Sequence, residues 1–490
     1  MRDWLSERAQ ATPDKTALVC AGTKLTFADL ARKSGEYRRV LADKDVHIKQ
    51  GQNIALLGGN TCETVAMIFA LIQIGAVIVP LNTRLTPEEI DYQVSGTNCT
   101  VLLYEQSLKT LAEKLTPSTY QIAPYPASTL SEHVEDYPPE MLDLDEPFAI
   151  IHTSGTSGKP KGTVLSYGNV FHSAMASAYR IGHNPNDKWL CCLPLYHIGG
   201  LSIIIRACLY GITVDLHQKF DATEINHALT HHEITLISLV PTMLYRLLEV
   251  RAEPWSSKLR LVLLGGSATS PDLMEKCFDL QIPVATTYGL SEAASQVATT
   301  LPGDAIRKPG SVGKPLLFTS VRIIDENGGI LAAGQLGEIA VKGQTVMKGY
   351  FNNPEASTRT LRDGWMYTGD MGYVDADGDL WVVQRRSDLI ISGGENVYPV
   401  EVENILKQHP AVKIACVVGI DNPEWGQQVA AAIVLHPEQP VTITELNVFC
   451  RQHLAGYKQP RHIRVVAELP LTASGKIHRL SVQELLKENM

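Results

Sequence analysis

A glycine-rich loop at residues 152–162, HTSGTSGKPKG, concentrates glycines, hydroxyls and lysines directly after a short apolar run at 148–151. Bare backbone N–H groups, hydroxyls and ammonium groups are the donors that a cluster of phosphate oxygens requires, so the loop is a candidate nucleotide site. The same composition is typical of a plain connecting turn, and composition alone leaves both interpretations open. A Walker A loop is excluded, because it needs a hydroxyl residue after its lysine, whereas Pro160 follows Lys159 here.

Two further side chains that could do chemistry lie in one apolar stretch, residues 188–217. Arg206 stands among leucines and isoleucines, where an unpaired cation would cost on the order of several kcal/mol. Its guanidinium therefore either reaches water or pairs with an anion. His197 follows a Pro-Leu-Tyr turn, and a lone histidine in such a segment is more often a buried core residue than a functional group.

Short apolar runs that recur between segments of helical period are the elements that must position these side chains. The runs lie at 53–58, 99–104, 212–217, 234–240 and 259–266. The alternation of strand and helix predicts parallel sheets covered by helices on both faces. From 311 to 386, short alternating strands separated by ENGG and DADGD turns predict a small antiparallel β section.

The length of the chain, 490 residues, exceeds what one hydrophobic core usually organises, so two or more domains are expected. We place a large α/β domain at 1–386. We place a small α+β domain at 387–490, because that part combines helical patterns at 400–408 and 444–454 with two apolar strand patterns.

Composition and charge narrow the class of protein. A net charge of −9 argues against a nucleic-acid partner, and an apolar fraction of 44% is ordinary for a globular protein. Nine cysteines lack metal-ligand spacing, which predicts buried, reduced thiols in a cytoplasmic protein. The first residues lack the apolar core of a signal peptide, and the most apolar stretch, 65–79, is too short to span a bilayer. The oligomeric state is left open, a homodimer or larger assembly included.

Five stretches, in this order, resemble the adenylate-forming superfamily of acyl-CoA synthetases, luciferases and peptide-synthetase adenylation domains. They are TSGTSGKPKG (153–162), YGLSE (288–292), GEIAVKG (337–343), YTGD (367–370) with RRSDLIISGGENVYPVEVE (385–403), and PLTASGKIHR (470–479). Each motif alone is weakly specific, but five in order argue strongly against coincidence. The resemblance covers nearly the whole chain and implies a large α/β domain followed by a small, mobile C-terminal domain.

The resemblance implies two half-reactions. A carboxylate attacks the α-phosphate of ATP to give an acyl-adenylate and pyrophosphate, and a thiol then displaces AMP. Glu292 would bind Mg²⁺, which prefers hard oxygen ligands, Tyr288 would stack on adenine, and Asp370 would accept hydrogen bonds from both ribose hydroxyls. The complete set of implied nucleotide-binding residues is Thr153, Ser154, Gly155, Thr156, Lys161, Gly265, Gly266, Ser267, Tyr288, Gly289, Ser291, Asp370 and Arg385.

The C-terminal motifs imply a catalytic lysine, a hinge and a tunnel for the thiol. Lys476 matches the lysine that the superfamily brings to the carboxylate and the α-phosphate, where its charge stabilises the negative charge that develops. The small domain would rotate about a hinge at Ser387 or Asp388; many relatives carry Asp or Lys there, so Ser387 departs from the pattern. Gly393 and Gly394 would line the tunnel for the thiol arm of CoA. On local sequence alone, Lys476 is an exposed loop lysine and the two glycines are a simple turn.

The acid is suggested by residues 188–217, which resemble the subfamily of o-succinylbenzoate:CoA ligases of menaquinone biosynthesis. This implies an aromatic acid with two carboxylates, a gate at His197, and a pocket in which Arg206, Ser295 and Gln296 hold the second carboxylate. The alternatives are another aryl- or medium/long-chain acyl-CoA ligase, an adenylating enzyme with a different acceptor, and a nucleotide-binding regulator without catalysis. Retention of the catalytic residues named above argues against the last.

Overall fold

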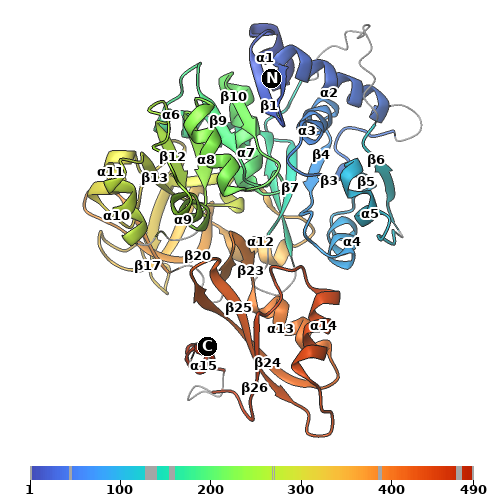
Figure 1. Cartoon of the computed structure of the whole chain (residues 1–490), viewed down its shortest axis with the longest axis vertical. Helices are drawn as coiled ribbons and strands as arrows, with labels where there is room; N and C mark the ends of the chain where they lie inside the picture. Colours follow the sequence, from blue (N-terminus) through green and yellow to red (C-terminus); the bar gives the residue numbers. More distant parts are fainter. Residues whose placement is uncertain are drawn as a thin grey trace. The chain divides into compact units, whose positions relative to one another are not determined.

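The computed structural model describes residues 3–42, 47–117, 119–126, 141–153, 160–266, 269, 271–384, 389–470 and 477–487. Contacts divide the chain into two compact units, which are drawn together in Figure 1. The large unit comprises Met1–Thr83, Val94–His152 and Gly162–Gln384, and the small unit comprises Arg84–Gln93, Thr153–Lys161 and Arg385–Met490. The helices are α1 (Trp4–Ala11), α2 (Phe27–Ala42), α3 (Cys62–Ile74), α4 (Pro87–Gly96), α5 (Lys109–Ala112), α6 (Tyr167–Ile181), α7 (Ile198–Tyr210), α8 (Ala222–His231), α9 (Pro241–Glu249), α10 (Pro271–Asp279), α11 (Pro302–Arg307), α12 (Pro354–Thr360), α13 (Pro399–Gln408), α14 (Ile443–His453) and α15 (Arg479–Lys487).

One sheet has seven strands in the order β18-β8-β7-β4-β3-β5-β6. Four of its neighbouring pairs, from β7 to β6, are parallel, as the alternation of strand and helix predicts. The glycine-rich loop connects β7 to β8. The strands are β3 (Asn53–Leu57), β4 (Val77–Pro80), β5 (Val101–Tyr104), β6 (Gln121–Pro124), β7 (Pro147–Thr153), β8 (Lys161–Ser166) and β18 (Gly349–Tyr350).

The second sheet has fourteen strands along the path β16-β17-β20-β21-β15-β14-β13-β12-β11-β9-β10-β1-β2, with β19 beside β20. Pairs from β13 to β1 are parallel, and those from β13 to β16 are antiparallel. The predicted antiparallel section thus continues the parallel sheet. The strands are β1 (Thr16–Cys20), β2 (Thr23–Thr26), β9 (Lys188–Cys191), β10 (Thr213–Leu216), β11 (Leu236–Leu239), β12 (Leu261–Leu264), β13 (Val284–Leu290), β14 (Ser295–Thr299), β15 (Ser311–Pro315), β16 (Thr319–Ile324), β17 (Gly337–Gly343), β19 (Leu361–Arg362), β20 (Trp365–Val374) and β21 (Leu380–Gln384).

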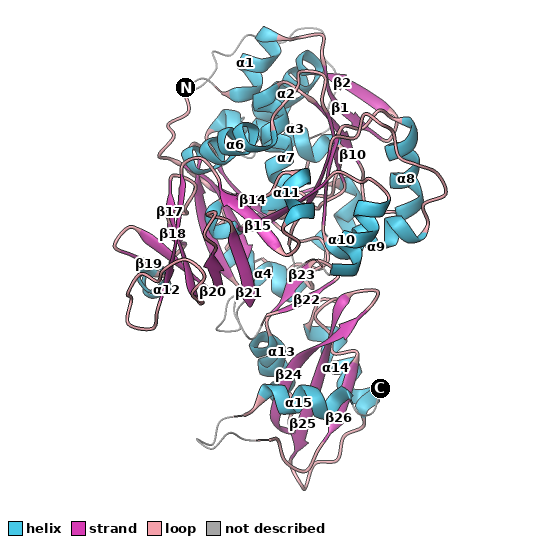
Figure 2. Ribbon diagram, turned by 90° about the vertical axis from the view of Figure 1, so that its left-hand side faces the viewer, coloured by secondary structure: helices cyan, strands magenta, loops and turns pink. Residues whose placement is uncertain are grey.

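Helices cover both faces of the parallel strands. Helices α3 and α7 are apolar around most of their circumference, and such helices must be buried on all sides. They share one core with residues of both sheets, whereas α8, α9 and α10 cover the opposite face of β9, β11 and β12. Figure 2 shows these three helices on the same side of the large unit. Strand β9 shows the alternation directly, because Trp189 packs into the first core and Leu190 into the second.

The small unit contains a five-stranded sheet in the order β23-β22-β25-β24, with β26 parallel to β25. Helices α13 and α14 begin and end within one residue of the predicted ranges. The large α/β part and the small α+β part predicted from the sequence are therefore confirmed as fold classes. The strands are β22 (Ile390–Ser392), β23 (Glu395–Val397), β24 (Val412–Asn422), β25 (Gly426–Leu435) and β26 (His462–Val465).

Two predictions about the whole chain can be checked as well. All nine cysteines fall within the described ranges, and each is buried and free of a disulfide. In the part of the chain that the structure describes, no helix is both long and apolar enough to cross a membrane.

Candidate active site

The ends of the glycine-rich loop are described, and its centre is not. Strand β7 ends at Thr153 and β8 begins at Lys161, and the hydroxyl of Thr153 lies 3.5 Å from the carbonyl oxygen of Lys161. Gly162 is required for packing, because a Cβ there would lie 2.6 Å from Cγ2 of Ile150. The other predicted phosphate-binding residues of the loop lie outside the described residues: Ser154, Gly155 and Thr156.

Two predicted nucleotide-binding residues meet although they are far apart in the sequence. The hydroxyl of Tyr288, on β13, donates to Oδ2 of Asp370, on β20, at 2.6 Å. The side chain of Tyr288 belongs to a hydrophobic core cluster, and only 2% of the residue is exposed. The structure therefore brings the predicted adenine and ribose contacts together, while stacking of adenine on Tyr288 stays a prediction.

A bulge in β20 explains how Asp370 leaves the regular strand. The register between β17 and β20 shifts between Glu338 and Ala340. Gly369, in the bulge, has φ +76, a left-handed conformation that favours glycine, and its N–H donates to Oε1 of Glu338 at 2.9 Å. The hydroxyl of Thr368 accepts from the backbone N–H of Asp370 at 3.1 Å. Glu338 of the GEIAVKG motif thus supports the YTGD motif, although no spacing rule joins them.

The predicted adenine-pocket glycines lie where β12 ends beside β13. Leu264 pairs with Thr286, so Gly265 follows opposite Thr287, and a Cβ on Gly265 would lie 2.7 Å from Cγ2 of Thr287. Gly266 has φ +86, so a side chain there would strain the backbone. Gly265 therefore lies opposite the residue before Tyr288, and the role of the two glycines in an adenine pocket stays a prediction. Ser267 lies outside the described residues.

Glu292, the predicted magnesium ligand, is held by two contacts in a short 3-10 helix (Ser291–Ala293). Oε1 of its carboxylate accepts from the hydroxyl of Tyr350 at 2.9 Å, and its backbone carbonyl accepts from the N–H of Met347 at 2.9 Å. Tyr350 lies on β18, which pairs with β8, the strand that follows the glycine-rich loop. The position of Glu292 is thereby tied to the sheet from which the loop emerges. Ser291 is half-buried beside it.

The turn after Glu292 has an unusual backbone. Ala294 and Ser295 both have positive φ, +50 and +98, a rare conformation for residues with a side chain. Gly289 makes the turn possible, because a Cβ there would lie 1.8 Å from the carbonyl oxygen of Ser295. Ser295 is half-buried at the start of β14, and Gln296 is buried.

Arg206 lies inside the molecule, near the middle of α7, with 2% of the residue exposed. The alternative in which its guanidinium reaches water is therefore wrong. Its Nη2 donates to the hydroxyl of Ser173 at 3.2 Å, and that hydroxyl donates to the carbonyl oxygen of Ala294 at 2.6 Å. Burial lowers the pKa of Arg206, and its Nε has no hydrogen-bond partner among the described residues. The side chain is thus a buried cation whose donors are only partly used.

His197 occupies the N-cap position of α7, next to Tyr196, and the ring centroids of the two residues lie 4.7 Å apart. The loop before it is fixed by Asn60, which the sequence did not single out. Oδ1 of Asn60 accepts from the N–H of Leu195 at 3.0 Å, and its Nδ2 donates to the carbonyl oxygens of Leu193 at 3.0 Å and His217 at 3.1 Å.

In the small unit, Gly393 and Gly394 form the two-residue turn of a hairpin. Ser392 pairs with Glu395, and the two glycines have φ of +59 and +83. Positive φ at both central residues is the requirement of the tight hairpin turns in which glycine dominates. The turn is thus observed, and the predicted tunnel wall stays a prediction. Three further predictions lie outside the described residues: Arg385 at the end of the predicted large domain, the hinge at Ser387 or Asp388, and Lys476.

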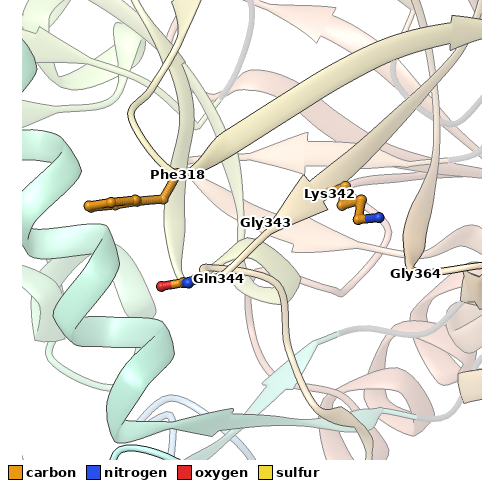
Figure 3. Close-up of a pocket in the computed structure, with 5 residues that line it drawn as sticks. All are labelled: Phe318, Lys342, Gly343, Gln344 and Gly364. Carbon is orange, nitrogen blue, oxygen red and sulfur yellow. The ribbon is translucent and has the colours of Figure 1, made fainter.

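A hollow of about 340 Å³ opens elsewhere in the large unit (Figure 3). Its lining residues are Phe318, Lys342, Gly343, Gln344 and Gly364. None of them is a predicted site residue. Sequence reasoning also missed Asn60, Ser173 and Tyr350, because no motif or spacing distinguishes a serine or tyrosine that supports a site from an ordinary core residue.

Comparison with family models assigns the chain to a family. The AMP-binding enzyme family matches residues 5–351, and the AMP-binding enzyme C-terminal domain matches residues 401–476. The chain therefore belongs to the AMP-binding enzyme family, and the predicted superfamily is confirmed.

Individual relatives within this family are similar to the chain over its full length. A 2-succinylbenzoate-CoA ligase of Bacillus cereus (strain Q1) is 41% identical over 494 residues, covering 100% of this chain and 99% of the relative. The structure of a double mutant of o-succinylbenzoate CoA synthetase from Bacillus subtilis, bound to the product analogue OSB-NCoA, superposes with a TM-score of 0.90 at 38% identity, covering 99% and 98% of the two chains. The same enzyme in complex with ATP and magnesium ion gives a TM-score of 0.75 at 38% identity, covering 99% of each chain.

Proposed function

We propose that the protein is an AMP-forming acid-thiol ligase that converts 2-succinylbenzoate, ATP and CoA into the CoA thioester, AMP and pyrophosphate. The observation that carries this proposal is the 41% identity to a 2-succinylbenzoate-CoA ligase over the full length of both chains. The meeting of Tyr288 with Asp370, and the fixed position of Glu292, support nucleotide binding.

The reaction has two steps. An oxygen of the succinyl carboxylate attacks the α-phosphorus of ATP, and the bond to the β-phosphate oxygen breaks to release pyrophosphate. The thiolate of CoA then attacks the acyl carbon, and AMP leaves with the bridging oxygen. The enzyme's task in the first step is to bring two anions together, so cationic groups must lie where negative charge develops.

Most of the nucleotide half of the site belongs to the large unit, whereas the stretch Thr153–Lys161 of the glycine-rich loop falls in the small unit. Asp370 is suited to both ribose hydroxyls, because a carboxylate accepts two hydrogen bonds. Glu292 would be the ligand for Mg²⁺, because Tyr350 occupies only Oε1 among the contacts described above, and a hard carboxylate oxygen fits this cation. When bound, Mg²⁺ would neutralise phosphate charge. The glycine-rich loop, with Thr153 and Lys161 at its ends, would hold the β- and γ-phosphates.

The C-terminal part supplies the mobile half of the site. We place the working domains at 1–386 and 387–490, with the hinge at Ser387 or Asp388. Lys476 would stabilise charge between the attacking carboxylate and the α-phosphate, whereas Arg385, at the end of the large domain, would bind the ribose. The Gly393–Gly394 hairpin turn would line the path of the CoA thiol arm, since a turn without side chains permits close approach.

The acid half of the site is centred on α7. Arg206 would pair with the aromatic carboxylate, because a buried guanidinium with unused donors needs an anion, and its fork can meet a carboxylate with two parallel N–H bonds. Ser295 and the buried Gln296 would complete the pocket, and His197 would stand between the acid and the thiol. The buried, unpaired cysteines fit a cytoplasmic location.

The test is release of pyrophosphate and AMP with a panel of acids, each with and without CoA. We expect pyrophosphate release to depend on 2-succinylbenzoate, and a CoA thioester to form with AMP release only when CoA is present. Faster turnover with a long-chain or simple aryl acid would show that this acid, and not 2-succinylbenzoate, is the preferred substrate. Acid activation without any CoA thioester would assign a different acceptor.

A further inference from the structure

A single hydroxyl connects the proposed carboxylate pocket to the turn that follows the magnesium motif. Ser173, on α6, has 2% of its surface exposed. It accepts from Nη2 of Arg206 at 3.2 Å and donates to the carbonyl oxygen of Ala294 at 2.6 Å. All three residues belong to the large unit, although Arg206 and Ala294 lie 33 and 121 positions from Ser173.

The direction of this chain of hydrogen bonds is fixed by chemistry. An arginine can only donate, a carbonyl can only accept, and a hydroxyl has one proton. The proton of Ser173 must therefore point at Ala294, which leaves a lone pair of the oxygen for Arg206. A buried polar chain with one possible direction holds its members in one arrangement, and each bond polarises the next.

The carbonyl that Ser173 holds lies at a strained point of the backbone. Ala294 and Ser295 both have positive φ, and such residues persist only where the surroundings hold them. The peptide between these residues carries the Ala294 carbonyl on one side and the Ser295 N–H on the other. Ser173 therefore fixes the orientation of the peptide that presents Ser295.

We propose that Ser173 is a positioning residue for acid specificity: its hydroxyl orients the Arg206 guanidinium and the Ala294–Ser295 peptide together, so that both face the second carboxylate of the substrate. This proposal rests on the proposed function. It goes beyond that function by naming the residue that sets the geometry of the pocket without touching the acid.

The experiment compares Ser173→Ala and Ser173→Cys with the parent enzyme. Cysteine keeps the volume of the site and replaces the hydroxyl by a weak S–H donor, so it separates hydrogen bonding from packing. Ser177→Ala is the matched control, because Ser177 is equally buried one turn further along α6. Steady-state kinetics are measured for 2-succinylbenzoate, for an analogue that lacks the ring carboxylate, and for ATP.

We expect both Ser173 variants to raise KM for 2-succinylbenzoate on the order of tenfold, the effect of losing one hydrogen bond to a charged group. The KM for ATP and the kinetics of the analogue should stay unchanged, and Ser177→Ala should resemble the parent enzyme. An equal loss with both acids, a parallel rise in KM for ATP, or the same change in Ser177→Ala would overturn the positioning role. A parent enzyme that does not activate the diacid overturns the proposed function itself, whereas an active parent with unaffected Ser173 variants overturns only the role of Ser173.

Discussion

Arg206 is a buried cation for which the described residues provide a hydroxyl and no carboxylate. Desolvation without a counter-ion is expensive, and burial accordingly lowers the pKa of this arginine. If position 206 only had to be filled by a buried side chain, a leucine or isoleucine would suffice, as at the neighbouring positions of α7. The unused donors are therefore best explained by an anion that arrives with the substrate.

Arg206→Ala should cost about 2–5 kcal/mol in kcat/KM for 2-succinylbenzoate, because the aromatic carboxylate would be buried without a partner. An analogue that lacks this carboxylate should be used almost equally well by both proteins. Measuring kcat/KM for both acids with both proteins completes a thermodynamic cycle, which isolates the interaction between Arg206 and the aromatic carboxylate. Equal losses for the two acids would refute the pairing.

His152, the first residue of the glycine-rich loop, predicts a pH effect on stability. Burial lowers its pKa to about 4, and its Nδ1 has no hydrogen-bond partner among the described residues. The unfolded chain binds a proton near pH 6.5, so the free energy of unfolding should fall as the pH drops from about 6.5 to about 4, by at most about 1.4 kcal/mol per pH unit from this group. Urea unfolding of His152→Gln over the same range should show a shallower decline. Identical pH profiles would show that the histidine is protonated freely in the native state.

At the scale of elements, the site depends on irregularities at the ends of strands and helices. The β20 bulge carries Asp370 out of the strand, the β13–β14 connection places Ser295, and the loop that Asn60 holds sets the start of α7. Regular strands and helices build the core. The proposed site residues lie where the regular hydrogen-bond pattern is interrupted. At these points the backbone can direct a side chain away from the orientation that a regular strand or helix gives it.

The hairpin turn at Gly394 can be tested by a pair of substitutions. Leucine at φ +83 would strain the backbone and also obstruct the proposed CoA path, whereas asparagine tolerates the left-handed conformation and has a similar size. We expect Gly394→Asn to keep acid-dependent ATP–pyrophosphate exchange and to lose thioester formation. Gly394→Leu should show the same pattern with a lower melting temperature. Normal thioester formation by the asparagine variant would place the CoA path elsewhere.

At the scale of the whole molecule, the proposed reaction divides between two units of the chain. Tyr288, Glu292, Asp370 and Arg206 belong to the large unit, whereas the stretch Thr153–Lys161 and the proposed catalytic lysine belong to the small one. Such a division predicts that the two half-reactions can be separated by single substitutions, because each needs a different part of the small unit.

Lys476→Ala should lower the rate of acyl-adenylate formation on the order of 10²–10³-fold, since one preorganised charge at the transferring phosphate is lost. The second half-reaction should be spared, because the lysine acts only while the acid attacks phosphorus. The measurement supplies synthetic acyl-adenylate and CoA directly and follows the thioester. A second half-reaction that falls as far as the overall reaction would remove Lys476 from this role.

The sequence by itself determined the alternating strands and helices, the antiparallel section, the small α+β part and the family. These properties are local: a strand needs a short apolar run, a buried helix needs apolar residues on all sides, and a tight turn such as Gly393–Gly394 needs glycine. The family motifs are also local, because each is a short run of neighbouring residues, and Glu292 and Asp370 can therefore be predicted as site residues from the sequence alone.

Only the tertiary structure decided which of these residues meet. Tyr288 contacts Asp370 across 82 positions, Ser173 contacts Ala294 across 121, and Asn60 contacts Leu195 across 135. Local sequence left two environments open for Arg206, and burial on α7 excludes the one in which its guanidinium is exposed to bulk water. The physical reason is that strand order in the sheets does not follow the chain, so a hydrogen bond between distant segments leaves no periodic trace in either of them.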